Sequence, residues 1–118
     1  MDTIKIDERT FKFSLQIIKL YKHLKTEHEY IMSKQLLRAG TSIGAYVEEA
    51  QAAQSRRDFI SKMSIASKEA RESKYWIRLL AHSGHLDNYT ESDKLLNEVN
   101  NIVNIITKIV KSTQEREN

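Results

Sequence analysis

Two apolar stripes dominate the middle of the chain, between Leu36 and Leu80, and both advance by gaps of three or four residues. The first consists of Leu36, Gly40, Ile43, Val47 and Ala50, and the second of Phe59, Met63, Ala66, Ala70, Ser73, Ile77 and Leu80. This spacing keeps each stripe on one face of an α-helix and directs it at a partner helix. Because the alternation typical of half-buried strands is absent, the sequence predicts two packed helices.

The flanking sequence continues this pattern. Near the start of the chain, two neighbouring helical lines consist of Phe13, Ile17, Leu20 and Leu24 and of Phe11, Leu15, Ile18 and Lys22. We expect both lines to form a wide apolar face in the core, and we expect the polar tail from Ser112 onward to fray. With no proline and three glycines, the 118 residues are predicted to form one domain. Its predicted fold is an all-α, antiparallel up-down four-helix bundle with helices at about 8–27, 30–53, 56–82 and 91–112.

Two glycines, Gly40 and Gly44, lie inside the predicted second helix. An interior glycine costs about 1 kcal/mol relative to alanine, so two of them indicate a specific reason. Close packing is one reason, because a glycine lets another backbone or a bulky side chain approach the helix. A phosphate-binding loop is the alternative, but the Gly-x-x-x-Gly spacing lacks the Lys-Ser/Thr of a P-loop and follows no strand. We therefore expect close packing.

The chain contains few patterns that point to catalysis or to a bound cofactor. It has no cysteine, which excludes disulfides, thiolate metal sites and a cysteine nucleophile. Glu69 and Glu72 lack the Glu-x-x-His pattern of di-iron bundles, and we expect them to pair with a cation instead. The candidate cations are Arg38, Arg71 and Lys68. We expect a protein that is no enzyme and that uses no cofactor, metal or small-molecule substrate.

The sequence also bears on location. The first residues carry acids where a signal peptide needs a basic region followed by an apolar run. No apolar run is long enough to span a bilayer. We expect a cytoplasmic protein that does not bind membranes.

Positive charge is concentrated in residues 55–83, which contain seven basic and three acidic side chains, within a chain of net charge +3. Lys68, Arg71, Tyr75 and Arg78 follow one another at gaps of three, four and three and form a basic stripe that includes an aromatic ring. Such a stripe suits phosphate contacts and base stacking, although it is also a common solvated helix face. The candidate nucleic-acid-binding residues are Arg56, Arg57, Lys68, Arg71, Lys74 and Arg78.

Trp76 lies beside the line of Ile77 rather than on it. A large aromatic side chain at this position either widens the core or belongs to a second contact surface, where tryptophan and tyrosine are over-represented. Ile65 also lies off the main stripe and favours the second interpretation. The candidate oligomer-interface residues are Ile65, Glu69, Glu72 and Trp76.

The central region resembles a known protein family. The residues that carry the resemblance are Gln35 to Ala45 (QLLRAGTSIGA), Glu49 and Ala50, Ser55 to Phe59 (SRRDF), Ile65 and Ala66, Lys68 to Ala70, Glu72, and Tyr75 to Leu80 (YWIRLL). They resemble the four-helix bundle proteins encoded within intervening sequences of bacterial 23S rRNA genes, sometimes labelled S23 ribosomal proteins. This chain departs from similar members at Tyr46, where they usually have asparagine, which puts any role of that amide in doubt.

The resemblance implies an antiparallel four-helix bundle that assembles as a ring, a homopentamer. The family is also similar to an accessory protein of diversity-generating retroelements, a basic pentamer that binds nucleic acid and works with a reverse transcriptase. One hypothesis is therefore a non-enzymatic oligomer that binds RNA or DNA non-specifically through a basic outer surface. The other is a protein-interaction or structural module, for example an accessory partner of a reverse transcriptase, with no direct nucleic-acid binding. Salt dependence discriminates between them, because affinity built on phosphate contacts falls steeply with salt.

Overall fold

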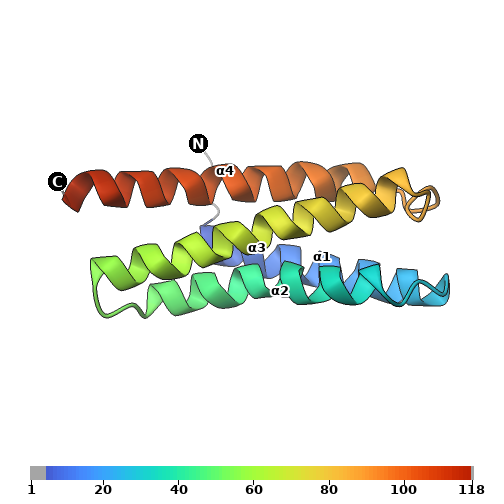
Figure 1. Ribbon diagram of the computed structural model, residues 1–118, viewed down its shortest axis with the longest axis horizontal. Helices are drawn as coiled ribbons and strands as arrows, with labels where there is room; N and C mark the ends of the chain where they lie inside the picture. The colour runs from blue at the N-terminus through green and yellow to red at the C-terminus, as the bar shows by residue number, and fades with distance from the viewer. Residues whose placement is uncertain (1–4, 118) are drawn as a thin grey trace.

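The computed structural model of the chain describes residues 5–117 and folds them into four helices (Figure 1). α1 spans Ile6–Thr26, α2 spans Met32–Gln51, α3 spans Arg56–His82 and α4 spans Ser92–Glu117. Consecutive helices reverse direction, and the α1–α2 and α3–α4 connections lie at the same end of the bundle. α1 and α3 each contact α2 and α4, so α1 and α3 lie diagonally across the bundle. The predicted all-α, four-helix fold is confirmed, with no strand among the described residues.

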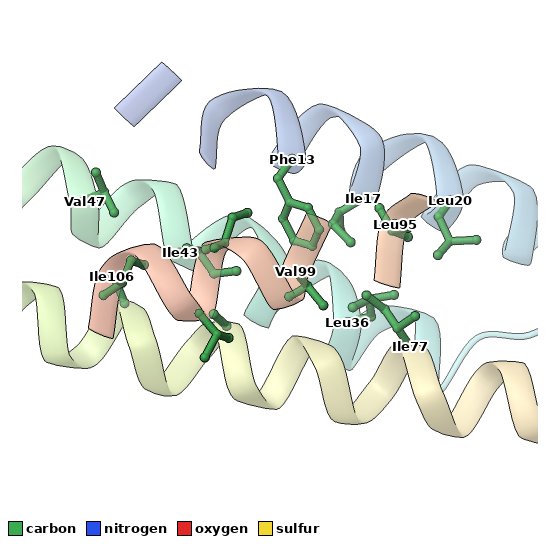
Figure 2. Packing of buried hydrophobic residues seen from close by; sticks show 14 of the residues in the cluster. Phe13, Ile17, Leu20, Leu36, Ile43, Val47, Ile77, Leu95, Val99 and Ile106 are labelled. Atoms are coloured by element: carbon green, nitrogen blue, oxygen red, sulfur yellow. The ribbon is translucent and has the colours of Figure 1, made fainter. Parts of the chain in front are cut away.

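The core takes side chains from all four helices and runs along the bundle (Figure 2). Its labelled members in Figure 2 are Phe13, Ile17 and Leu20 from α1, Leu36, Ile43 and Val47 from α2, Ile77 from α3, and Leu95, Val99 and Ile106 from α4. Full burial of one such side chain contributes about 1.5–3 kcal/mol relative to exposure. Burial therefore outweighs the low helix propensity of the β-branched residues that are frequent in α4.

Gly40 and Gly44 lie where α1 packs against α2. A Cβ atom added at Gly40 would lie 2.8 Å from Cγ1 of Ile17, which is closer than real Cβ contacts allow. A Cβ atom added at Gly44 would lie 3.4 Å from Oγ of Ser14 and from the carbonyl oxygen of Thr10. Ile17 can enter the core only because residue 40 lacks a side chain. The prediction of close packing is confirmed at Gly40, whereas a Cβ atom at Gly44 would make only ordinary contacts.

The turn between α1 and α2 is built around the buried side chain of Glu29. Its carboxylate accepts hydrogen bonds from the backbone N–H groups of Ile31 and Met32, both at 3.2 Å, and of Ser33 at 2.7 Å. These N–H groups belong to the first turn of α2 and its N-terminal cap, where no helical carbonyl is available to them. Burial acts to raise the pKa of Glu29, but the hydrogen bonds outweigh it and lower the pKa. An ionised carboxylate therefore starts α2.

The structure contradicts the expected width of the apolar face of α1. The line of Phe13 is buried, whereas Phe11 and Leu15 are 63% and 54% exposed. α1 packs closely against α2 but only lightly against α4, so its neighbours cover a single stripe. The second line, with Ile18 half-buried, lies at the outer edge of the α1–α2 contact. The expectation that both lines belong to the core was wrong.

The end of α4 also differs from the expectation of a fraying tail. α4 continues to Glu117, and Thr113 is only 4% exposed, with its hydroxyl donating to the carbonyl oxygen of Ile109 at 2.7 Å. The first turns of α3 lie beside the last turns of α4 (Figure 1). Arg56 Nη1 donates to the carbonyl oxygen of Arg116 at 3.2 Å and ties the two ends together. Contact with α3 therefore keeps the polar tail helical as far as it is described.

Candidate functional site

The outer face of α3 carries most of the residues predicted to bind nucleic acid. α3 begins at Arg56 because Oγ of Ser55 accepts a hydrogen bond from the backbone N–H of Asp58 at 3.0 Å. The apolar stripe of α3 faces the core, which leaves the opposite side of the helix to solvent. Of the six predicted residues, Lys74 is half-buried and the other five, Arg56, Arg57, Lys68, Arg71 and Arg78, are exposed.

The charges of this face are not neutralised by acids. Among residues 5–117, none of the six predicted cations forms an ion pair. Elsewhere, cations have acidic partners: Arg9 with Glu98, Lys12 with Glu8, Lys19 with Glu91, Arg38 with Glu69 and Glu72, and Lys62 with Asp58. At the start of α3, the hydrogen bond from Lys62 lowers the pKa of Asp58, so even this nearby acid is engaged. The outer face of α3 therefore carries an uncompensated positive charge.

These cations extend along the whole helix. Arg57 and Arg78 are separated by 21 residues, which corresponds to about 30 Å of helix at 1.5 Å per residue. Within this length, Lys68, Arg71 and Arg78 recur at intervals of one or two turns, with Tyr75 54% exposed among them. Duplex DNA carries one phosphate charge per about 1.7 Å of its axis, so a row of this length can contact several phosphates.

A shallow hollow between α3 and α4 extends this face. It has a volume of about 300 Å³ and is lined by Arg71 and Lys111, with Ser64, Ser67, Thr107 and Gln114 providing further polar groups. Sequence reasoning missed Lys111, because it considered only the charges of the third helix. The antiparallel pairing of α3 and α4 is the signal that points to it, since that pairing places the C-terminal half of α4 beside the first half of α3. Arg71 and Lys111 thus form one basic site from two helices.

The predicted oligomer-interface residues lie on the side of α3 that faces α2. Ile65, Glu69, Glu72 and Trp76 are all half-buried there. Nε1 of Trp76 donates to Oε2 of Glu72 at 3.0 Å, and Arg38 from α2 forms ion pairs with Glu72 and, at 3.5 Å, with Glu69. Pairing of these acids with Arg38 is confirmed. Their role in an interface between copies stays a prediction.

Two further properties of the described residues bear on the class of site. Within residues 5–117, no three histidine, aspartate or glutamate side chains come together in a way that could hold a metal ion. No helix in this part of the chain has the length and apolar character needed to cross a membrane. The basic face of α3 and the α3/α4 hollow bring together cations without acidic partners from two helices, and we take them as the candidate binding site.

Comparison with known proteins gives the family of the chain. A family model described as "23S rRNA-intervening sequence protein" matches residues 2–108, and no functionally curated protein matches. The matching solved structures include a protein with unknown function from the S23 ribosomal protein family of Bacteroides thetaiotaomicron VPI-5482. That match has 40% sequence identity and a TM-score of 0.86, and it covers 91% of this chain and 99% of that chain. This chain therefore belongs to the 23S rRNA-intervening sequence protein family, as its central motifs predict.

Proposed function

We propose that this protein is a non-enzymatic, cytoplasmic oligomer that binds RNA or DNA through the outer face of α3, with little sequence discrimination. The observation that carries the proposal is the row of unpaired cations along about 30 Å of α3, in a molecule whose other helices pair many of theirs. Long, flexible cationic side chains suit phosphates, which are the same in every sequence. Arg71 and Lys111 are the central contacts, because they face one hollow.

Tyr75 adds a contact that phosphate-binding cations lack. Its ring is 54% exposed and lies between Arg71 and Arg78 on the same face. Stacking of an unpaired base on such a ring contributes about 1–3 kcal/mol and tolerates any base. We therefore propose that single-stranded segments bind more tightly than duplexes.

Assembly strengthens this binding. The family resemblance supports a ring, and we propose a homopentamer as its form. A ring repeats the basic face once per copy, so one polyanion can contact several faces simultaneously. The effective concentration of a linked second site raises overall affinity without any new contact.

The test is binding of the purified protein to labelled single-stranded RNA and to duplex DNA at several salt concentrations, with the mass of the protein measured in the same preparation. We expect binding that weakens steeply as salt rises. The double variant Arg71→Glu with Lys111→Glu should weaken binding and reduce the slope of log affinity against log salt by about 2. The matched control is Lys22→Glu with Lys34→Glu, which makes the same charge change at exposed positions of α1 and α2.

Equal losses in the two double variants would show that net charge, and not the α3 face, controls binding. Absence of binding at low salt would remove the nucleic-acid proposal altogether. The second candidate function, a protein-interaction module such as a partner of a reverse transcriptase, would then take its place. The observation that favours this candidate is the aromatic pair of Tyr75 and Trp76, whose ring centroids are 5.1 Å apart at the surface of α3.

A further inference from the structure

Three asparagines, Asn97, Asn101 and Asn104, lie on one line along α4, between Lys94 and Lys108. Their gaps of three or four residues place them on one face of the helix, outside the apolar stripe. Asparagine forms helices poorly, because its carboxamide competes for backbone hydrogen bonds. All three residues are exposed, and none of their carboxamides forms a hydrogen bond with another described residue. This line of carboxamides, which we call the amide line, therefore has donors and acceptors that neither the helix nor its neighbours use.

The amide line borders a groove between α1 and α4. These two helices pack only lightly against each other, and two hollows of about 360 Å³ and 330 Å³ lie between them. Arg9 and Asn101 line both hollows, so the hollows form one groove, which we call the α1/α4 groove. Each volume lies within the range of small-ligand sites, about 300–1,000 Å³. The lining of the groove further includes Lys12, Gln16, Lys94, Asn97, Asn104 and Lys108.

The guanidinium group of Arg9 is fixed where the two hollows meet. Its Nε and Nη2 atoms donate to the two carboxylate oxygens of Glu98 at 2.8 and 3.0 Å, and this ion pair joins α1 to α4. The side chains of the pair are only 17% and 23% exposed. A planar guanidinium that is already ordered offers a surface on which a nucleobase can stack, with little loss of side-chain entropy. The centre of the groove therefore suits a flat, polar ring.

The charge best placed for a ligand belongs to Lys108. This residue lines the second hollow and forms no ion pair with a described residue. By contrast, Arg9 and Lys12 are paired with acids, and Lys94 lies within electrostatic reach of Glu91. An exposed ammonium group without an acidic partner suits a phosphate. The second hollow therefore offers a phosphate contact beside the carboxamides.

The α1/α4 groove thus combines carboxamides, a flat cation and an unpaired lysine. A carboxamide donates and accepts at the same time, so it matches the edge of a nucleobase, above all the N6 and N7 atoms of adenine. We propose that the groove binds one nucleotide, with its base against Asn97 and Asn101 and its phosphate at Lys108. Asn101 and Lys108 are seven residues apart, about 10 Å along the helix, a span that an extended nucleotide can bridge. The groove is separate from the site of the proposed function, because it contains no residue of α3.

The experiment measures the binding of labelled AMP, and of a short single-stranded oligoadenylate, to the purified protein by equilibrium dialysis. Asn101→Ala should weaken AMP binding about tenfold, because the base loses a paired donor and acceptor. Asn100→Ala is the matched control, since it makes the same change at the adjacent residue, which lines neither hollow, and it should bind AMP normally. Alanine improves helix propensity, so Asn101→Ala should be at least as stable as the wild type. Weaker binding without a loss of stability identifies a binding role and excludes a structural one.

Lys108→Gln tests the phosphate contact. It should weaken AMP binding several-fold and leave the binding of adenosine, which has no phosphate, unchanged. Lys111→Gln is the matched control, because that lysine lies three residues further along α4 and lines the α3/α4 hollow instead. Equal losses of AMP and adenosine binding in Lys108→Gln would contradict a phosphate at this residue.

The two ligands identify the source of the nucleotide. If oligoadenylate loses affinity in Asn101→Ala, the groove accepts a nucleotide within a strand, and if AMP alone loses affinity, it takes the free nucleotide. The proposal is overturned if Asn101→Ala weakens the binding of neither ligand, or if Asn100→Ala weakens binding as much. Wild-type protein that binds UMP as tightly as AMP would likewise exclude recognition of the base by the amide line.

These results are independent of the nucleic-acid test on α3. Arg71→Glu with Lys111→Glu alters no residue of the α1/α4 groove, so AMP binding should be unchanged in this double variant while RNA binding weakens. Asn101→Ala removes no charge, so the salt dependence of RNA binding should be unchanged. Wild-type protein that binds AMP but no RNA contradicts the proposed function alone. RNA binding that Asn101→Ala does not alter, without any binding of AMP, contradicts the nucleotide site alone.

Discussion

The hairpin of α1 and α2 and the hairpin of α3 and α4 present nearly the same pattern of apolar residues to the core but are built differently. In the first, the helices meet over Gly40, and a buried carboxylate at Glu29 starts the second helix. In the second, side chains such as Met63, Ile77 and Ile106 fill the contact, and a longer loop, residues 83–91, joins the helices. Both hairpins therefore rest on buried apolar side chains, and the first adds two specific features, the glycine contact and the carboxylate that caps α2.

Their outer surfaces differ in charge. The outer surface of the first hairpin combines an apolar groove with unpaired acids at Asp7 and Glu48. That of the second carries the unpaired cations of α3 and Lys111 of α4. Because the inner faces alone define the fold, the outer faces are free to carry different functions.

The largest expected effect on stability is at the contact between α1 and α2. Gly40→Ala should lower the free energy of unfolding by about 2 kcal/mol, because the new Cβ meets the stiff, β-branched side chain of Ile17. Gly44→Ala is the matched control, since its Cβ makes only ordinary contacts. It should leave stability unchanged or raise it by up to about 1 kcal/mol, through improved helix propensity. Denaturant titration of both variants measures the difference, and equal effects would show that the first hairpin does not depend on this contact.

Much of this fold could be predicted from the sequence, because helical spacing and glycine positions are local signals. The burial of the stripes and the contact at Gly40 required only the spacing of three and four residues. The exposure of Phe11 and Leu15 could not be predicted in the same way, because it depends on how closely the neighbouring helices pack against α1. The C-terminal end of α4 stays helical because the start of α3 lies beside it. This contact could not be predicted from the sequence of α4 itself.

The next largest effect on stability is expected at Glu29, in the turn between α1 and α2. The pKa of Glu29 is lowered in the folded protein, so its contribution to stability is present above the ordinary carboxyl value of 4.5 and is lost as the pH falls through the folded pKa. Glu29→Gln should lower the free energy of unfolding by about 1 kcal/mol at neutral pH. It should also remove part of the loss of stability in acid. Thermal unfolding from pH 7 to pH 3 tests this, with Glu49→Gln, an exposed position of α2, as the control. A variant that keeps the full acid sensitivity of the wild type would contradict the assignment.

The candidate site was predictable only in part. The exposure of the α3 cations followed from helical periodicity, as did the nearness of Arg38 to Glu69 and Glu72 once two helices were paired. Whether a given cation is neutralised depends on the side chains that the neighbouring helices bring to it. The sequence gives no sign that Arg38 and Arg71 differ, yet only Arg38 forms ion pairs with acidic side chains. The α3/α4 hollow with Lys111 and the hollow between Phe11 of α1 and Gly44 of α2 each depend on two helices, so no single segment could reveal them.

The smallest effects on stability come from the cations, and they test the division between the hairpins most directly. Arg38→Gln leaves Glu69 and Glu72 without their partner, so it should lower the free energy of unfolding by up to about 1 kcal/mol and leave the salt dependence of RNA binding unchanged. Arg71→Gln removes an unpaired charge, so it should leave the melting temperature unchanged and reduce the slope of log affinity against log salt by about 1. The two variants make the same chemical change, and each should alter only one of the two measurements. If both variants alter both measurements, structural and binding cations are not separate sets, and the basic face of α3 cannot be treated as a surface available for ligands.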